Sequence, residues 1–155
     1  FFERNKGRYN EKSLTEQYLT LNLEGMDFIG FADRIDIRED GAEIIDYKTG
    51  KTSIAPKDRN WQLGFYALAA QDKYGSVKKV VLDMLKQERP LEFQIDKQGN
   101  ALCISSQYID GFNIYNVKKE LIETGKKILE AYKKGFKPCP IEKNCDFCNE
   151  YVYRV

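Results

Sequence analysis

Residues 30–51, with the sequence GFADRIDIREDGAEIIDYKTGK, place charged side chains inside two segments that otherwise resemble β-strands. Side chains alternate between the two faces of a strand, so the inward positions of a core strand are normally apolar. Asp33, Asp36, Asp46 and Lys48 depart from that rule. The chain must therefore fold into a sheet in which each of these side chains lies on a defined face. Ion pairs or a bound ion must neutralise the charges that become buried.

Apolar and polar residues alternate around this stretch in a pattern that predicts a meander of three antiparallel strands with turns at Gly25 and Gly41. A Gly- and Pro-bearing loop follows over residues 50–60. The expected strands cover residues 15–23, 28–37, 42–49, 78–86 and 91–96. The expected helices cover 61–74 and about 107–134, the latter as one long helix or two joined near Gly125. This order of elements predicts an α+β domain with a central mixed sheet flanked by helices.

Length and composition limit the classes of protein that fit. A chain of 155 residues suits a single domain, and no apolar run approaches the ~18 residues that a membrane span requires. The formal net charge is only +1, so bulk charge does not indicate nucleic-acid binding. Because the first residue is Phe1, we expect the chain to be a piece of a longer polypeptide. Its cysteines, without a secretory signal peptide, favour a reducing, cytoplasmic location.

Asp33 and Asp46 lie on strands joined by the Gly41 turn, where facing side chains stand about 5 Å apart. Two such carboxylates repel each other unless a hard divalent cation such as Mg²⁺ binds between them. Lys48 projects from the same face as Asp46 and could orient a water molecule or act as a base. An equally strong alternative is a structural ion network of Asp46 with Lys48 and of Asp33 with Arg34.

The residues that carry a family resemblance are Gly30 to Asp33, the Asp-Tyr-Lys-Thr-Gly run of residues 46–50, and the Gln-x-x-x-Tyr segment of residues 62–66. In this order and at these short spacings they resemble the PD-(D/E)XK nuclease superfamily, and within it the RecB-like and AddB-like nuclease domains. The resemblance implies a restriction-endonuclease-like core.

Carried onto this chain, the resemblance implies that Asp33 and Asp46 bind Mg²⁺ or Mn²⁺, with the backbone carbonyl of Tyr47 as a further ligand. Lys48 becomes the catalytic lysine. Gln62 and Tyr66 correspond to the helix residues that support the site or contact the DNA backbone. Asp36, in the Asp-Arg-x-Asp variant of the motif, is expected to be structural rather than metal-binding.

One feature of RecB-like nucleases has no counterpart in the chain. They usually contribute another metal ligand, often histidine, from a helix before the first strand, and this chain contains no histidine. Either that helix lies in a preceding segment, or Glu3, Glu11 or Glu16 substitutes for the histidine. The active site would then be incomplete in this chain.

The tail over residues 136–155 carries Cys139, Cys145 and Cys148, of which the last two have the C-x-x-C spacing that grips one metal or cluster edge. Several relatives of the resembled branch hold a 4Fe–4S cluster at this place, but Arg154 stands where their last cysteine falls. The alternatives are a cluster, a zinc site or free thiols. Cys103 is either a fourth ligand or a small buried apolar residue.

The sequence therefore predicts a Mg²⁺- or Mn²⁺-dependent deoxyribonuclease, expected to be an exonuclease of DNA repair or recombination with a helicase domain or subunit as its partner. Lys51, Lys57 and Arg59 would neutralise DNA phosphates, and Trp61 would either stack on a base or pack its helix. Two other interpretations remain open. One is a catalytically inactive nuclease-like module for DNA binding or scaffolding, and the other is an unrelated α+β protein with a small zinc-binding tail.

Overall fold

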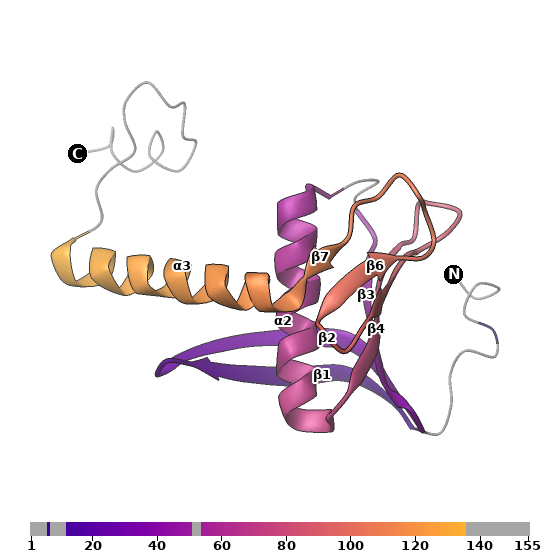
Figure 1. Ribbon diagram of the computed structural model, residues 1–155, viewed down its shortest axis with the longest axis horizontal. Coiled ribbons are helices and arrows are strands. Elements are labelled where there is room, and N and C mark those ends of the chain that lie inside the picture. Colours follow the sequence, from indigo (N-terminus) through magenta and orange to yellow (C-terminus); the bar gives the residue numbers. More distant parts are fainter. Residues whose placement is uncertain (1–5, 7–11, 51–53, 136–155) are drawn as a thin grey trace. The chain divides into compact units, whose positions relative to one another are not determined.

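The computed structural model describes residue 6 and residues 12–50 and 54–135. Its strands form one seven-stranded sheet whose spatial order follows the chain from β1 to β7 (Figure 1). All neighbouring strands are antiparallel except β3 and β4, which are parallel because helix α2 connects them. The elements are β1 (Ser13–Leu23), β2 (Met26–Arg38), β3 (Gly41–Lys48), α2 (Pro56–Tyr74), β4 (Val77–Met84), β5 (Leu91–Ile95), β6 (Asn100–Cys103), β7 (Phe112–Asn113) and α3 (Ile114–Lys134). The expected α+β fold with a mixed sheet is confirmed.

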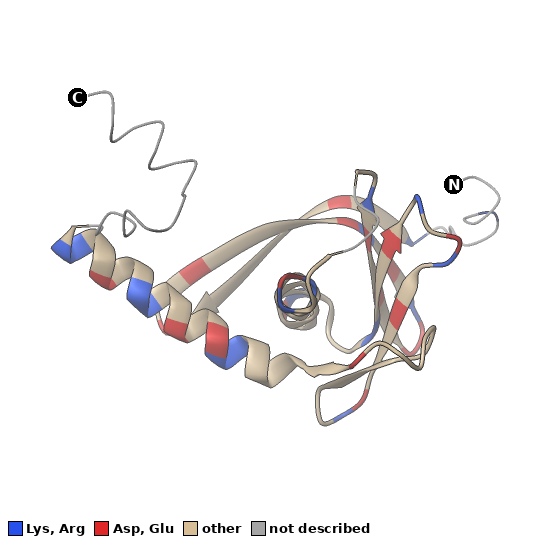
Figure 2. Ribbon diagram, turned by 90° about the horizontal axis from the view of Figure 1, so that it is seen from above, with Lys and Arg blue, Asp and Glu red and all other residues tan. Residues whose placement is uncertain are grey.

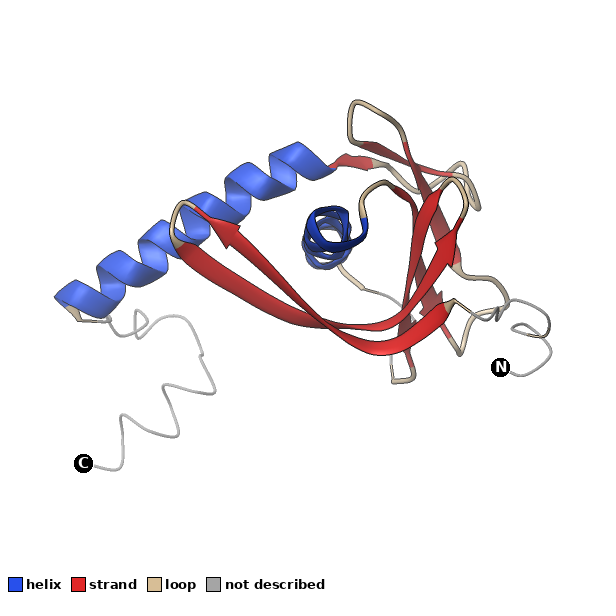
Figure 3. Ribbon diagram, turned by 90° about the horizontal axis from the view of Figure 1, so that it is seen from below, coloured by secondary structure: helices blue, strands red, loops and turns tan. Residues whose placement is uncertain are grey.

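Helix α2 lies inside the curve of the sheet, where Figures 2 and 3 show it end-on. Its residues 63–70 are all buried, so the helix is enclosed on every side rather than packed along one stripe. It begins at Pro56, five residues before the expected start, because proline fits the first turn, where its missing N–H costs nothing. The segment expected to be a loop up to Asn60 therefore contributes the first turn of the helix.

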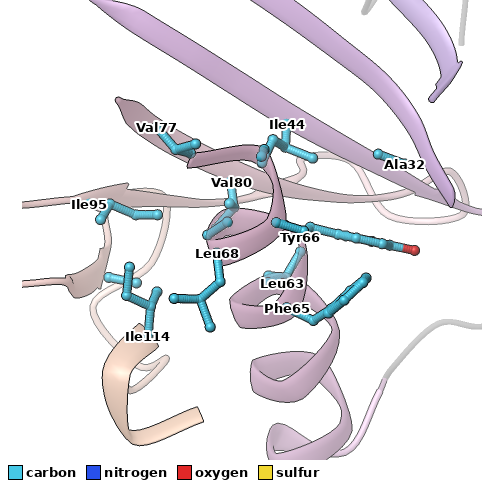
Figure 4. Close-up of a cluster of buried hydrophobic side chains, with 14 of the residues drawn as sticks. Ala32, Ile44, Leu63, Phe65, Tyr66, Leu68, Val77, Val80, Ile95 and Ile114 are labelled. Carbon is cyan, nitrogen blue, oxygen red and sulfur yellow. The ribbon is translucent and has the colours of Figure 1, made fainter. Parts of the chain in front are cut away.

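Side chains from α2, from the inner face of the sheet and from the start of α3 form one hydrophobic core. Gly64 allows the close approach of the two helices, since a Cβ there would lie 2.8 Å from Val117. Figure 4 shows the central part of this core, with Leu63, Tyr66 and Leu68 of α2, Ile44 and Val80 of the sheet, and Ile114.

The last third of the described chain differs from the expectation of one long helix, or two joined near Gly125, over about residues 107–134. Residues 100–103 and 112–113 form two further strands, and α3 begins only at Ile114. The side chain of Asn113 accepts hydrogen bonds from the backbone N–H groups of Tyr115 and Asn116, at 2.9 and 3.3 Å, and so caps the helix. Because Asn113 caps the helix and also pairs with β6, the helix does not extend upstream to residue 107 as expected.

The chain divides into two compact units, residues 1–122 and 123–155, with the boundary inside α3. In the second unit the described residues continue α3, where Ile128, Leu129 and Tyr132 are exposed and Lys134 pairs with Glu130 at 2.5 Å. No helix in the described part of the chain is long and apolar enough to cross a membrane.

Candidate active site

The candidate site forms where β2 and β3 separate. Their pairing runs from Arg38 opposite Gly41 to Arg34 opposite Ile45 and ends there, while the preceding residues of β2 pair with β1. One more step of the same register would place Asp33 opposite Asp46. Instead of a backbone partner, the N–H of Tyr47 finds the Asp33 carboxylate, with 2.7 Å between the nitrogen and Oδ2. The gap between the strands is thus bridged by an acidic side chain.

Strand β2 is irregular at Asp33. Ala32 and Ile35 are both fully buried in the core, although strict alternation would put residues three apart on opposite faces. Glu16, which would face Asp33 on β1, has a positive φ of 50°. This irregularity lets Asp33 leave the normal alternation, and its negative charge acts on both Asp46 and Tyr66 by raising their pKa values.

Asp46 lies at the end of the inner face of β3 and is only 3% exposed. Its Oδ1 accepts a hydrogen bond from Gln62 Nε2 at 3.1 Å, and its Oδ2 lies 2.8 Å from Lys48 Nζ. Despite that ion pair, Oδ2 is buried and accepts no hydrogen bond of normal geometry. Burial raises the pKa of Asp46, the Lys48 ammonium opposes this, and the Asp33 carboxylate raises the pKa further. Asp46 is therefore a buried carboxylate whose charge is incompletely compensated.

Helix α2 delivers two polar side chains to this carboxylate from successive turns. Gln62 Nε2 bonds to Asp46 and also to the Tyr66 hydroxyl, at 3.1 Å in each case. Burial raises the pKa of Tyr66, and the neighbouring carboxylates add to the rise, so the phenol stays protonated at neutral pH. The helix can come this close to β2 because residue 30 is a glycine: a Cβ there would lie 2.6 Å from the ring of Phe65. The Gly-x-x-Asp motif thus combines a packing position with the acid itself.

An open hollow of about 370 Å³ adjoins this cluster at the end of β3. Tyr47, Lys48, Thr49, Gly50, Ile54 and Gln62 line it. Lys48 therefore both pairs with the buried Asp46 and lines the open hollow.

The opposite face of the sheet carries a different charge cluster around Arg34. Arg34 binds Asp36 through two parallel hydrogen bonds of 2.7 and 2.5 Å, and both side chains are buried. The alternative of a structural ion network is met in part: the expected Asp46–Lys48 pair is present, and Arg34 pairs with Asp36. Asp36 is structural, as expected. The sequence interpretation missed Arg34 as a structural centre, although its i, i+2 spacing to Asp36 on a strand places both on one face.

The expected DNA-contacting residues divide into different groups. Arg59 is only 4% exposed; it donates to the Asp110 carbonyl at 3.0 Å and lies 5.0 Å from the centre of the Phe93 ring, so the interpretation of Arg59 as a phosphate-binding residue is wrong. Lys57 is exposed on the first turn of α2, with its Nζ 5.1 Å from the centre of the Trp61 ring. Trp61 donates from Nε1 to Glu120 and packs against the core, which favours the packing role. Lys51 lies outside the described residues.

The carboxylates present fit a divalent cation. Asp46, whose pKa is raised by burial and by the neighbouring Asp33 carboxylate, forms with Asp33 a pair of carboxylates suited to a hard cation. Among the described residues, no cluster brings together three or more Asp, Glu, His or Cys side chains. Glu16 is exposed, and Glu3 and Glu11 lie outside the described residues, so the further ligand that was expected upstream stays a prediction.

The cysteines of the tail, Cys139, Cys145 and Cys148, also lie outside the described residues, and their cluster or zinc site stays a prediction. Cys103 is partly buried on β6, packs against the core and lies 3.6 Å from Ser105 Oγ. This environment matches the interpretation of Cys103 as a small apolar residue.

The fold and site define a class: a mixed sheet in which the antiparallel strands β2 and β3 present an acid and an Asp-x-Lys pair, and a helix connects β3 to the parallel strand β4. The model of the PD-(D/E)XK nuclease superfamily matches residues 3–150, so the chain belongs to that superfamily. Its members are in general hydrolytic nucleases that use divalent metal ions and act on DNA. This membership excludes the unrelated α+β protein. Among curated proteins no match was found.

Proposed function

We propose that this protein is a Mg²⁺- or Mn²⁺-dependent deoxyribonuclease that hydrolyses phosphodiester bonds at the Asp33–Asp46–Lys48 cluster. The observation that carries the proposal is the state of Asp46, which is buried beside a second carboxylate and keeps a raised pKa although Lys48 Nζ lies 2.8 Å from its Oδ2. An acid kept in this condition is suited to a cation.

The residues divide the work by position. Asp33 and Asp46, with the Tyr47 backbone carbonyl, would hold the cation, which when bound polarises the scissile phosphate and lowers the pKa of water. Lys48 reaches from Asp46 toward the open hollow, where its ammonium can orient the attacking water and stabilise charge on the phosphate. Gln62 fixes Asp46 Oδ1 and Tyr66 together and so keeps the carboxylate aimed at the site.

Of the three residues expected to contact DNA outside the reaction centre, two are kept in the proposal. Lys57 is exposed on the first turn of α2, and Lys51 is close to it in sequence. Both would neutralise phosphates flanking the scissile bond, which makes binding depend on salt. Arg59 is not included because it is buried.

The finer assignment follows the motif residues. The Asp-Tyr-Lys-Thr-Gly run of residues 46–50 and the Gln-x-x-x-Tyr pair Gln62 and Tyr66 support a RecB-like or AddB-like domain. We place it in a DNA repair or recombination exonuclease that works with a helicase domain or subunit, and Cys139, Cys145 and Cys148 support a 4Fe–4S cluster or zinc site in the tail. A cytoplasmic location agrees with this function.

The experiment is DNA cleavage by the full-length protein with Lys48→Ala, and with Lys79→Ala as the matched control. Lys79 is also a partly buried, ion-paired strand lysine, 28% exposed against 25% for Lys48, but it lies on the opposite face of the sheet, where it pairs with Glu43. We expect Lys48→Ala to reduce cleavage by at least about 100-fold while DNA binding persists, because removing a group that stabilises the transition state typically has this effect. Lys79→Ala should cleave normally.

Equal cleavage by both variants would remove Lys48 from the mechanism. Wild-type protein that binds DNA but cleaves none with either cation would instead support a catalytically inactive DNA-binding or scaffolding module.

A further inference from the structure

The charge cluster on the reverse face of the sheet is anchored by Asp36. Besides the two bonds from Arg34, its Oδ1 accepts a hydrogen bond from Ser13 Oγ at 2.7 Å. Arg34 and Asp36 are each at most 2% exposed. A bidentate guanidinium–carboxylate pair in this setting fixes the plane of the arginine. Arg34 is therefore a rigid donor rather than a mobile surface side chain.

The remaining terminal nitrogen of that guanidinium points to β3. Arg34 Nη1 donates to the Tyr47 hydroxyl at 3.2 Å. Tyr47 belongs to the face of β3 opposite to Asp46 and Lys48, so its side chain lies on the reverse face while its backbone belongs to the candidate site. One residue thus links the two faces of the sheet.

The position of Tyr47 in the sheet gives this contact its importance. On one side Tyr47 pairs with Asp83 of β4, but on the other side the pairing of β3 with β2 has already ended at Ile45. Across that gap Asp33 holds the Tyr47 backbone N–H at 2.7 Å, and the next residue, Arg34, holds its hydroxyl. Two consecutive residues of β2 therefore hold one residue of β3, from its backbone and from its side chain.

We propose that Arg34 and the Tyr47 hydroxyl are positioning residues for the cation site: the Arg34–Asp36 pair holds the Tyr47 side chain on the reverse face, and this keeps the Tyr47 peptide against Asp33. This inference rests on the proposed function for its effect on cation binding, but its geometric part concerns the apo protein alone. Because groups that orient metal ligands commonly control metal affinity, loosening Tyr47 should weaken cation binding without removing any ligand.

The first test needs no metal. Tyr47→Phe removes the hydroxyl but keeps the ring, and Tyr74→Phe is the matched control because it removes another partly buried tyrosine hydroxyl, one that bonds to Gln17 at 2.9 Å. Amide hydrogen exchange of the full-length protein is followed by NMR. We expect the amide at position 47 to exchange about fivefold faster in Tyr47→Phe, the equivalent of roughly one lost hydrogen bond, with amides in α2 unchanged. Tyr74→Phe should leave position 47 unchanged.

Either of two results would overturn the proposal. A uniform rise in exchange rate over all amides would mean that the hydroxyl contributes only to global stability. An unchanged exchange rate at position 47 would mean that the hydroxyl does not hold this peptide. Should Tyr47→Phe fold poorly, Arg34→Lys is used instead, with the exchange rate of the position 47 amide read relative to that of the α2 amides, because lysine keeps the charge beside Asp36 but lacks the planar fork.

The second test measures Mn²⁺ affinity by the electron paramagnetic resonance of free Mn²⁺. We expect about tenfold weaker binding for Tyr47→Phe and wild-type affinity for Tyr74→Phe. Equal affinities of Tyr47→Phe and wild type would overturn the positioning role while leaving the proposed nuclease intact. A wild type that binds no Mn²⁺ would contradict the proposed function and the effect on cation binding, whereas a faster amide at position 47 would still uphold the geometric part.

Discussion

The two faces of the sheet each carry a buried ion pair between strand residues two positions apart, and the two pairs differ in how completely they are satisfied. On the reverse face, Arg34 and Asp36 are each 2% exposed and joined by two hydrogen bonds. On the inner face, Asp46 is 4% exposed in its side chain, Lys48 is 25% exposed, and Asp46 Oδ2 lacks a hydrogen bond of normal geometry.

The difference separates a structural charge from a functional one. A buried ion pair offsets its desolvation only when geometry is good and the remaining lone pairs are bonded, as they are at Asp36. Asp46 retains a raised pKa despite its lysine, because burial and Asp33 outweigh the ion pair. The same i, i+2 pattern of opposite charges in the sequence thus serves stability on one face and, in our proposal, cation binding on the other.

The largest effect on stability should come from replacing the basic residue of each ion pair. Arg34→Gln leaves Asp36 buried without its charge partner, and we expect the free energy of unfolding to fall by about 3–5 kcal/mol. Lys48→Gln should cost less than about 1 kcal/mol, because the lysine is 25% exposed and solvent screens its ion pair with Asp46. Urea unfolding of both variants measures the difference. Equal losses would mean that the inner pair is structural too.

A smaller change should come from neutralising the inner acid. Asp46→Asn removes a charge that the fold disfavours, since its pKa is raised by burial first, while asparagine still offers an oxygen to Gln62. We expect stability to be unchanged or to rise by up to about 1 kcal/mol while cleavage is lost, the pattern of a residue kept for function. The melting temperature at neutral pH tests this. A drop of several degrees would place Asp46 among the structural acids.

The smallest effect concerns a third acid, Asp96, which is exposed but well bonded. Its carboxylate accepts hydrogen bonds from the side chain and backbone of Asn100 and from the backbone of Gln98, and these contacts lower its pKa, with the Asn100 side chain as the largest cause. Because the pKa of Asp96 is lower in the folded state, its carboxylate stabilises the folded protein at pH values above the unfolded pKa of about 3.9. This stabilisation is lost as the pH falls through the folded pKa. Asp96→Ala should therefore lower the melting temperature slightly at pH 7 and less at pH 3. If the difference in melting temperature between wild type and Asp96→Ala is as large at pH 3 as at pH 7, the effect comes from the turn conformation and not from the charge of Asp96.

Local patterns in the sequence predicted the elements that local chemistry determines. The three-stranded meander, the Asp46–Lys48 pair and the structural role of Asp36 follow from period-two spacing and turn glycines. The irregularity at Asp33 was not predictable, because it arises where β2 keeps pairing with β1 while β3 departs toward β4. Arg59 was misread for a similar reason: its burial depends on Asp110 and Phe93, which are distant in sequence.

The late start of α3 belongs to the same category. The expected helix extended upstream of Ile114 to about residue 107, but Asn113 caps the helix while pairing with Asn100 of β6. Only a long-range partner distinguishes the two outcomes.

The most direct test of the central claim, that Asp33 and Asp46 form a divalent-cation site, is calorimetric titration of the full-length protein with Mn²⁺. Wild type, Asp33→Asn, Asp46→Asn and Glu43→Gln are compared, where Glu43 is an acid on the opposite face of the sheet with ion pairs to Arg38 and Lys79. The account predicts that wild type and Glu43→Gln bind Mn²⁺ equally, while each aspartate variant loses at least about 100-fold in affinity. Unchanged Mn²⁺ binding by Asp33→Asn and Asp46→Asn would contradict it.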